Sequence, residues 1–225
     1  MKVVVLCAMW KRHEVFKIWA NNIKQLGVDV VVVGSEGAIS KNLCNDFDYV
    51  EYKNKPLSNK WNAGLSHLLK NHQFDYVLIL GSDDIVTPNY IDLFSNHLIN
   101  GMTGRTDSFQ FNLITKKCGY FSGYKNYRRG ETVGAGRFID IKTIKKLNGA
   151  LWDDGLNMSL DFSMVTKMKK AKIPIKGVQI KDMGVIGMGI KGKLNMNKFN
   201  PHRFVDPSSI LKQFDSQTQK MISKF

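Results

Sequence analysis

The chain has 225 residues, of which 43% are hydrophobic and 11% aromatic, and its formal net charge is +14. This length and apolar content predict one large globular domain, residues 1–225, around a single sizeable core. The N-terminal apolar run ends before Lys11, which makes it too short for a signal peptide or a membrane span. Cys7, Cys44 and Cys118 form no CxxC pair, so neither a disulfide framework nor a structural zinc site is indicated. We therefore expect a cytoplasmic protein, in the host cytoplasm if its source is viral, without stable insertion into membranes.

The positive charge is confined to the second half of the chain. Residues 1–100 contain equal numbers of basic and acidic side chains, so residues 101–225 carry the whole excess. Lysine-rich solvated surfaces are common, and they keep proteins soluble. An excess limited to one half favours an acidic partner for that half, which would be a nucleic acid, an anionic membrane surface or a phosphorylated glycan.

Apolar runs of strand length alternate with helical patterns over the first hundred residues. Continuously apolar strands separated by crossover helices are typical of a parallel sheet that is covered on both faces. The expected strands are Lys2–Cys7, Asp29–Gly34, Tyr49–Tyr52 and Tyr76–Leu80, and the expected helices are 15–26, Trp61–Lys70 and Tyr90–Ile99. Because Tyr76–Leu80 is the most hydrophobic strand, we expect it at the centre of the sheet.

The second half begins with a different composition. Residues 108–138 are rich in Phe, Tyr, Gly, Lys and Arg, which predicts a β meander with loops, including a strand near Ser108–Ile114. The patterns that follow predict helices at Ile141–Leu147, Met158–Lys170 and Ser208–Phe225, and edge strands at Ile173–Gln179 and Asp182–Ile190. The expected fold class is therefore α/β, a Rossmann-type, mostly parallel sheet with helices on both faces and a small β and loop subregion.

Two adjacent carboxylates follow directly on the expected central strand. Ligands of parallel sheets bind outside the carboxyl ends of the strands. Asp83 and Asp84 stand there, and carboxylates suit Mg²⁺ or Mn²⁺ shared with substrate phosphates. The alternative is that one of them caps the helix that begins near Pro88, a role that Asp often has.

The segment Gly81-Ser82-Asp83-Asp84 resembles the metal-binding motif of GT-A glycosyltransferases, especially family 2-like members. Gly81 stands where the first Asp of a strict DXD motif would be, so which carboxylate binds the metal stays open. The resemblance implies a GT-A-like fold, a Mn²⁺ or Mg²⁺ cofactor and a nucleotide-sugar donor, with a UDP-sugar favoured. It also implies a donor-binding half at 1–100 and an acceptor-binding half at 101–225.

Further segments resemble the donor-binding loops of the same family. They follow the first and second strands and precede the metal motif. The implied donor-binding residues are Ala8, Met9, Trp10, Arg12, Gly34, Glu36, Lys60, Asn62, Ser82 and Asp83. Lys60 and Asn62 would act from a helix N-terminus, which favours anions. An ordinary surface lysine and a helix cap are the alternatives for these two.

Acceptor-side and catalytic residues are implied in the second half. Gly134-Ala135-Gly136-Arg137 resembles the acceptor-side glycine loop of the family, in which missing side chains let the backbone approach the sugar. The acidic base of inverting members would be Asp161, with Asp154 as second choice. The alternative for Asp161 is a helix N-terminal charge that the helix dipole favours.

The C-terminal region offers weaker candidates. Some GT-A enzymes complete the metal shell with a C-terminal histidine, which makes His202 a candidate metal ligand, and Lys191, Lys193 and Arg203 could close over the diphosphate. The other four histidines, His13, His67, His72 and His97, show no spacing that suggests zinc, and we assign them no chemistry.

Basic and aromatic side chains alternate between Lys116 and Arg129, among them Tyr124, Arg128 and Arg129. That mixture suits a nucleic acid, a carbohydrate or merely the core of a β meander. The charge distribution favours a nucleic acid as acceptor. The resemblance, extended to viral and phage DNA-modifying glycosyltransferases, implies DNA with a hydroxymethylated base, and duplex DNA would require base flipping.

Two other functions remain open. One is a glycosyltransferase acting on a saccharide or lipid-linked glycan at an anionic membrane surface. The other is a nucleotidyltransferase or a non-catalytic nucleic-acid-binding protein. The chain has no GxxxxGK[ST] triphosphate loop near its first strand, which counts against a nucleotidyltransferase.

Overall fold

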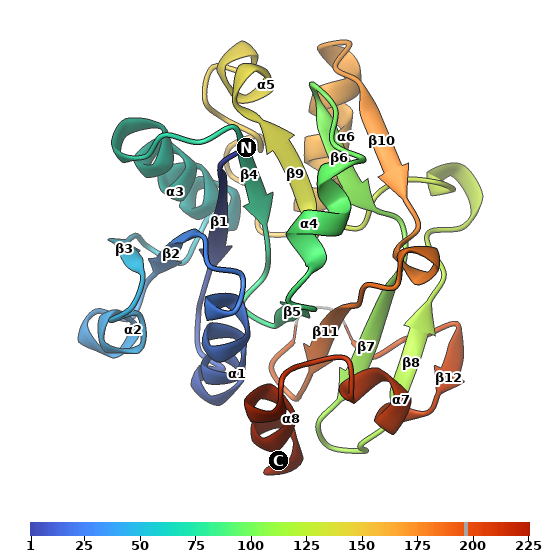
Figure 1. Ribbon diagram of the computed structural model, residues 1–225. Coiled ribbons are helices and arrows are strands. Elements are labelled where there is room, and N and C mark those ends of the chain that lie inside the picture. The colour runs from blue at the N-terminus through green and yellow to red at the C-terminus, as the bar shows by residue number, and fades with distance from the viewer. Residues whose placement is uncertain (196–197) are drawn as a thin grey trace.

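The computed structural model describes residues 1–195 and 198–225, which form two sheets flanked by helices (Figure 1). The larger sheet has seven strands in the order β10-β6-β9-β4-β1-β2-β3, and the smaller has five in the order β12-β8-β7-β11-β5. The larger sheet consists of β1 (Val3–Ala8), β2 (Asp29–Gly34), β3 (Asp48–Glu51), β4 (Tyr76–Ile79), β6 (Met102–Arg105), β9 (Arg137–Asp140) and β10 (Ile175–Val178).

The first four strands of the larger sheet are parallel. β1 lies between β2 and β4, and β3 follows β2 at the edge. The chain therefore builds outward from β1 to β3 and then returns to the other side of β1 as β4. This reversal of strand order creates a topological switch point at the carboxyl ends of β1 and β4, where ligands of open α/β sheets bind. β4 is the middle strand of the seven, as its apolar sequence predicts.

Helices cover both faces of the larger sheet. One face packs against α3 (Leu57–Asn71), α5 (Ile141–Lys146) and α6 (Leu160–Lys170), and the other packs against α1 (His13–Lys24), α2 (Ala38–Leu43) and α4 (Tyr90–Ser95). Alternate residues of β1 serve the two cores: Val4 and Leu6 face α3, whereas Val3 and Val5 face α1. Because both faces are buried, the strand is apolar throughout.

The smaller sheet forms a third core with the C-terminal helices. It consists of β5 (Asp84–Val86), β7 (Ser108–Asn112), β8 (Cys118–Phe121), β11 (Gly187–Lys191) and β12 (Arg203–Val205). Its apolar side chains pack with α7 (Pro207–Leu211), α8 (Ser216–Ser223) and Ile18 of α1. Short 3₁₀ helices, η1 (Asn126–Arg128) and η2 (Ile180–Met183), lie in the connections. No helix in the described ranges, 1–195 and 198–225, is both long and apolar enough to cross a membrane.

Three expected elements differ from the structure. The helix expected at Tyr90–Ile99 ends at Ser95. The predicted edge strand Asp182–Ile190 begins only at Gly187, because η2 and the left-handed Gly184 (φ 69°) precede it, and it lies inside the smaller sheet between β7 and β5. The predicted single helix Ser208–Phe225 is two helices. Asp215 starts the second one by accepting a hydrogen bond from the backbone of Thr218, which is a typical N-cap.

Candidate active site

The acidic pair lies where the two sheets meet. β4 ends at Ile79, Asp83 follows in the turn, and Asp84 begins β5 of the smaller sheet. Asp83 is only 9% exposed, and three side chains surround its carboxylate. Arg12 lies 3.1 Å from Oδ1 and Lys191 lies 3.2 Å from Oδ2, to which Asn195 also donates a hydrogen bond. Burial raises the pKa of Asp83, but the Lys191 and Arg12 charges outweigh it and hold that pKa below its ordinary value.

Asp84 has a different environment. Its Oδ2 accepts a hydrogen bond from the backbone of Gly81 at 3.2 Å, and its Oδ1 lies 3.3 Å from the guanidinium of Arg105. Burial and the neighbouring Asp83 charge raise the pKa of Asp84 above its ordinary value. The two carboxylates thus differ in basicity, and Asp83 is the one more firmly ionised.

The loop after β1 reaches the acidic pair across the switch point. Arg12 adopts a left-handed conformation (φ 52°), and its guanidinium donates to the Ser82 hydroxyl at 2.9 Å as well as pairing with Asp83. Glu36, beyond β2, accepts a hydrogen bond from the backbone of Lys11 at 2.7 Å and lies 3.2 Å from His13. The structure therefore brings Arg12, Ser82 and Asp83 together, and the Glu36 contacts stabilise the loop that carries Arg12.

Other residues of this loop differ in accessibility. Trp10 is 43% exposed, whereas Met9 is buried and Ala8 ends β1 with a partly buried side chain. Trp10 is thus the side chain of this group that a ligand can reach from solvent. Gly34 is required for packing, because a Cβ there would lie 2.5 Å from the Tyr49 ring.

Lys60 does not occupy the position expected of a donor contact. Its side chain is fully buried, and its amine donates to the Met9 carbonyl, the Ser35 hydroxyl at 3.0 Å and the Asn54 side chain at 3.3 Å. All three ammonium hydrogens are used, so none is available to a diphosphate. Burial lowers the pKa of Lys60 to about 8. Lys60 therefore positions the loops after β1 and β2.

Asn62 also turns inward. Its amide donates to the Trp152 carbonyl at 2.9 Å and accepts from the Trp152 backbone N–H at 3.4 Å. These two bonds attach the segment before α6 to helix α3. The structure thus gives Asn62 a positioning role and not the expected contact with donor.

The glycine loop lies between the acidic pair and Asp161. Arg105, which pairs with Asp84, also donates to the Ala135 carbonyl at 3.0 Å. A Cβ on Gly134 would lie 3.1 Å from Cβ of Asp161, and a Cβ on Gly136 would lie 2.6 Å from the Tyr90 hydroxyl. Both glycines permit close packing, so the loop connects the two acidic groups that the sequence singled out.

Arg137 does not have the role expected of it, which was a contact with the acceptor. Its side chain is fully buried and donates to three backbone carbonyls, those of Thr132, Val133 and Asp161. Burial lowers the pKa of Arg137 to about 10. This side chain holds the first turn of α6 in place and cannot meet an acceptor phosphate.

Asp161 sits in that first turn with two side-chain partners. Its Oδ2 accepts hydrogen bonds from the Tyr124 hydroxyl and from Arg128, both at 2.8 Å, and the Arg128 guanidinium stacks 3.7 Å from the Tyr124 ring centre. Burial raises the pKa of Asp161, but the hydrogen bonds from Arg128 and Tyr124 outweigh it and lower that pKa. Tyr124, Arg128 and Asp161 are thus brought together. Arg129 and Asp154 are exposed.

His202 lies far from the acidic pair. It precedes β12, whereas Asp84 starts β5, and these are the two outer strands of the smaller sheet. Four strand spacings separate them, roughly 19 Å at about 4.8 Å each. The His202 ring instead lies near the Phe121 ring and within 2.8 Å of the Ser122 hydroxyl. The expectation that His202 completes a metal shell with Asp83 or Asp84 is therefore wrong.

The carboxylate oxygens of the acidic pair fit a hard cation. Asp83 and Asp84 supply carboxylate oxygens, which Mg²⁺ and Mn²⁺ prefer. Desolvation and the Asp83 charge together raise the pKa of Asp84, and a divalent cation at the pair would relieve that repulsion. Such a cation would have to displace Lys191 or Arg12 from Asp83, because both oxygens of that carboxylate are engaged.

Two residues of the candidate site, Arg105 and Asn195, were not expected from the sequence. Arg105 ends β6, is 1% exposed and has one guanidinium nitrogen, Nη1, without a hydrogen-bond partner. Asn195 follows β11 and binds Asp83. Neither lies in a recognisable motif. The one available signal for Arg105 is an arginine in the apolar and small-residue segment that becomes a buried strand.

Comparison with known proteins gives structural matches alone, since no protein-family model and no curated protein matches this sequence. The structure of Staphylococcus aureus TarS residues 1–349 matches with a TM-score of 0.57 and 13% identity, over 84% of this chain and 60% of that one. The same protein in complex with UDP-GlcNAc matches with a TM-score of 0.54 and 12% identity, over 100% of this chain and 71% of that one. The chain thus spans about 60% of the TarS structure in the first of these alignments.

A second kind of enzyme matches equally well. The inositol-1-phosphate CTP transferase from T. maritima matches with a TM-score of 0.53 and 13% identity, over 100% of this chain and 96% of that one. These likenesses establish the fold. The chain has the α/β fold of the GT-A glycosyltransferase and nucleotidyltransferase type, which confirms the fold class expected from the sequence.

Proposed function

We propose that this protein is a metal-dependent glycosyltransferase that moves a sugar from a nucleotide-sugar donor, with a UDP-sugar favoured, to a hydroxyl acceptor. The observation that carries the proposal is the Asp83–Asp84 pair at the carboxyl end of the central strand, facing Arg12 from the loop after β1. Carboxylates for a metal and cations for a diphosphate are thereby gathered at the switch point of the sheet.

The donor would lie between the loop after β1 and the acidic pair. Arg12 and Lys191 each carry a positive charge that now faces Asp83, and both would serve the diphosphate once a metal ion occupies the carboxylates. The exposed Trp10 ring offers a surface on which the base can stack. The complex of TarS with UDP-GlcNAc agrees with a nucleotide sugar as ligand of this fold.

Asp83 and Asp84 would hold the Mn²⁺ or Mg²⁺ ion, which supplies Lewis-acid stabilisation of the departing nucleoside diphosphate. Arg105 keeps Asp84 oriented, because it bonds Asp84 and the Ala135 carbonyl at the same time.

Asp161 is the proposed general base if the transfer inverts the anomeric centre. The acceptor oxygen would form a bond to the anomeric carbon, the bond from that carbon to the diphosphate would break, and the hydroxyl proton would pass to Asp161. The Arg128 and Tyr124 hydrogen bonds make Asp161 a weak base in the unliganded protein. An acceptor hydroxyl must therefore take the place of one of them. Asp154, which is exposed, is the alternative.

A nucleotidyltransferase is the second candidate, since the T. maritima enzyme aligns along nearly its full length. The loop after β1 argues against it. That loop runs from Met9 to Arg12, contains no glycine, and has its backbone tied to Val33 by a hydrogen bond from Met9 at 2.9 Å. A short loop without glycine cannot wrap a triphosphate with consecutive backbone N–H groups in the manner of a glycine-rich loop.

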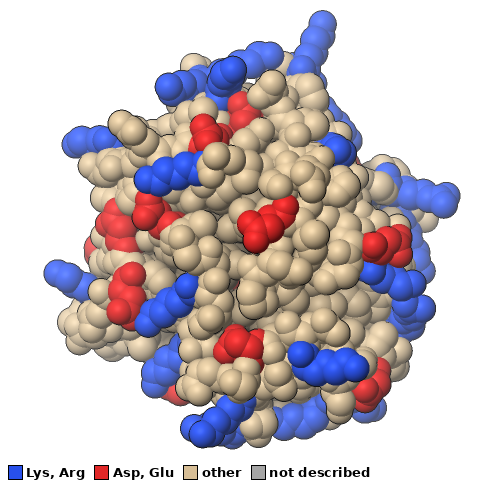
Figure 2. All heavy atoms as spheres, viewed as in Figure 1, with Lys and Arg blue, Asp and Glu red and all other residues tan. Residues whose placement is uncertain are grey.

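For the acceptor, the proposal remains a hydroxymethylated base in DNA, supported by the basic excess in residues 101–225. The exposed cations of the basic and aromatic segment include Lys117, Lys125 and Arg129, whereas Arg128 is engaged by Asp161 and Glu131. Figure 2 shows Lys and Arg side chains spread around one face, interspersed with Asp and Glu and not gathered in a single patch. The alternative acceptor is a saccharide, because the aromatic side chains of this segment would suit a carbohydrate as well as a base.

Ligand-induced stabilisation tests the donor class. The melting temperature should rise with UDP or a UDP-sugar when Mn²⁺ is present, and the rise should disappear in Asp83→Asn. CTP or another nucleoside triphosphate is the matched comparison. Stabilisation by triphosphates alone would favour the nucleotidyltransferase and contradict the proposal.

A further inference from the structure

A cluster of histidine and aspartate side chains lies at the opposite end of the larger sheet from the acidic pair. Asp48 is the first residue of β3, His67 lies in α3, and His72 follows the end of that helix. Their potential ligand atoms all lie within 4.8 Å of one another, and all three residues are partly buried. Asp83 follows β4, whereas Asp48 begins β3, so the two sites occupy opposite ends of the parallel strands.

The contacts within the cluster are close. Oδ2 of Asp48 lies 2.6 Å from Nε2 of His67 and 2.7 Å from Nε2 of His72. Burial raises the pKa of Asp48, but the hydrogen bonds from His72 and His67 outweigh it and lower that pKa. Two imidazoles thus face one ionised carboxylate.

We propose that Asp48, His67 and His72 form a binding site for a divalent transition-metal ion, with Zn²⁺ as the representative ion. Two imidazole nitrogens and one carboxylate oxygen are ligands that Zn²⁺ binds, whereas Mg²⁺ and Ca²⁺ prefer oxygen alone. Tetrahedral ligands at Zn²⁺ distances lie about 3.4 Å apart. The Asp48–His67 and Asp48–His72 separations are 2.6 and 2.7 Å, so each would have to widen by about 0.7–0.8 Å to admit the ion.

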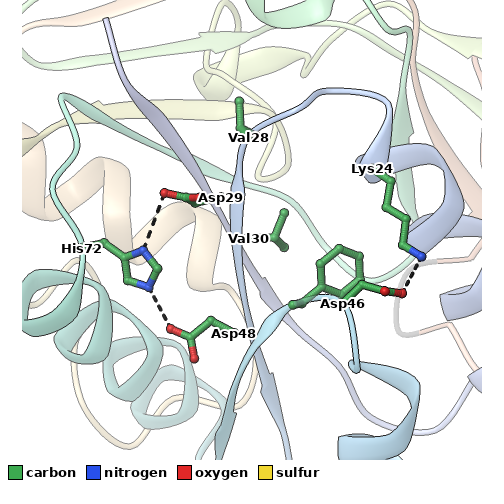
Figure 3. Close-up of a pocket in the computed structure, with 8 residues that line it drawn as sticks. Lys24, Val28, Asp29, Val30, Asp46, Asp48 and His72 are labelled. Carbon is green, nitrogen blue, oxygen red and sulfur yellow. Dashed lines mark hydrogen bonds and ion pairs between the residues drawn. The ribbon is translucent and has the colours of Figure 1, made fainter.

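A second carboxylate supports His72 from its other side. Asp29, the first residue of β2, has Oδ2 3.9 Å from Nδ1 of His72, and Figure 3 shows the His72 ring between Asp29 and Asp48. Metal-binding histidines usually direct the second ring nitrogen to a carboxylate or carbonyl, which fixes the ring and raises its basicity. Asp29 is placed for that role and not for direct ligation.

The site is open on the side of a shallow pocket of about 280 Å³. Its lining includes Asp29, Asp46, Asp48 and Phe47. Lys24 pairs with Asp46, and Lys2 lies 3.0 Å from the same Asp29 oxygen that faces His72. Because His72 and Asp48 also line this pocket, the cluster borders solvent-accessible space.

The ion would stabilise the edge of the larger sheet. β3 has β2 as its one neighbour in that sheet, and the ion would link the start of β3 to the end of α3. The expected role is therefore structural, and it is independent of sugar transfer.

The experiment is a zinc titration of the untagged, full-length protein in competition with a chromophoric chelator of micromolar affinity. We expect one tight ion per chain and a higher melting temperature with zinc. His67→Ala and His72→Ala should each weaken binding at least about tenfold. His97→Ala is the matched control and should bind as the wild type does. Asp83→Asn should also bind normally, which separates this site from the active site.

A surface variant keeps the test independent of folding defects. Asn71 is exposed, and its side-chain amide lies 3.1 Å from Nδ1 of His67. Asn71→Asp would place a carboxylate against that nitrogen and should strengthen zinc binding, whereas Asn96→Asp, at the end of α4, should leave it unchanged. Absence of competition with the chelator, or equal affinity in wild type, His67→Ala and His72→Ala, would overturn the proposal.

Discussion

The amine of Lys191 lies 3.2 Å from a carboxylate oxygen of Asp83, although the two residues are 108 positions apart in the sequence. Lys191 ends β11, which runs between β7 and β5, and β5 begins one residue after Asp83. The smaller sheet thus brings a cation from the second half of the chain to the acidic pair of the first half. In the proposed enzyme this contact is exchanged when metal and donor bind.

The first prediction concerns Lys191→Met. Because the ammonium and a divalent cation compete for the same oxygen of Asp83, the variant should bind Mn²⁺ more tightly. Its KM for the donor should rise about tenfold, because one charged hydrogen bond to the diphosphate is lost. Calorimetry with Mn²⁺ and steady-state kinetics measure the two effects. Lys145→Met, at an exposed lysine of α5, is the control. Weaker Mn²⁺ binding in Lys191→Met would refute the exchange.

The second prediction concerns the acidic pair. Asp83→Asn and Asp84→Asn should each lower metal-dependent turnover about 100-fold or more, because the metal supplies several kcal/mol of transition-state stabilisation. Far-ultraviolet circular dichroism should show an unchanged fold. Wild-type activity in either variant would show that the metal is bound elsewhere.

The third prediction separates the two candidate bases. Asp161→Asn should abolish turnover and leave donor binding intact, because the proposed role of Asp161 begins only when the acceptor hydroxyl attacks. Asp154→Asn should retain most activity. Kinetics and donor titrations of both variants measure this difference, and the reverse pattern would transfer the role to Asp154.

The fourth prediction follows from the buried Lys60. At a pH of about 10, Lys60→Met should lower the free energy of unfolding by about 1–3 kcal/mol, because the acceptors of Lys60 are left without their donor. The pKa is about 8 in the folded protein and 10.5 in the reference state, so the unfolded chain holds more protons between these values. The Lys60 contribution therefore increases as pH rises from about 8 to 10.5 and is lost as pH falls.

Denaturant unfolding of wild type and Lys60→Met across that pH range checks the sign. Subtracting the two free energies of unfolding cancels the contributions of the cysteine and tyrosine titrations, which both proteins share. A difference that shrinks as pH rises would mean that Lys60 stays charged in the folded protein.

The fifth prediction concerns the acceptor. Lys125→Ala combined with Arg129→Ala should weaken binding to duplex DNA and reduce the salt dependence of that binding by about two counterions. Both side chains are exposed, so the fold should be unaffected. Binding measured by fluorescence anisotropy over a range of salt concentrations tests this. An unchanged salt slope would remove this segment from the interface and favour a saccharide acceptor.

The local pattern of apolar residues was sufficient to predict the parallel strands of the fold. The apolar runs predicted β1, β2 and β4, and the central place of β4 followed from its sequence. Asp83 and Asp84 were found because they adjoin a strand end. The apolar pattern predicts one C-terminal helix in place of two, although Asp206-Pro207 and Asp215 each carry an N-cap signal that marks a new helix start.

Long-range contacts account for what the sequence did not indicate. Nothing local distinguishes Lys60 from a surface lysine, because its three partners come from separate loops. His67 and His72 are five residues apart, and on a continuous helix they would point about 140° apart. The helix ends at Asn71, and the extended backbone of His72 turns its ring toward Asp48.

The most direct test of the central claim is a turnover assay of the purified protein with a pool of nucleotide sugars, run with Mn²⁺ and with EDTA. Duplex DNA containing hydroxymethylcytosine and a set of saccharides serve as acceptors, and mass spectrometry identifies the products. We expect sugar transfer or donor hydrolysis that requires Mn²⁺ and disappears in Asp83→Asn. Inert nucleotide sugars, together with pyrophosphate release from a nucleoside triphosphate, would contradict a glycosyltransferase and identify a nucleotidyltransferase.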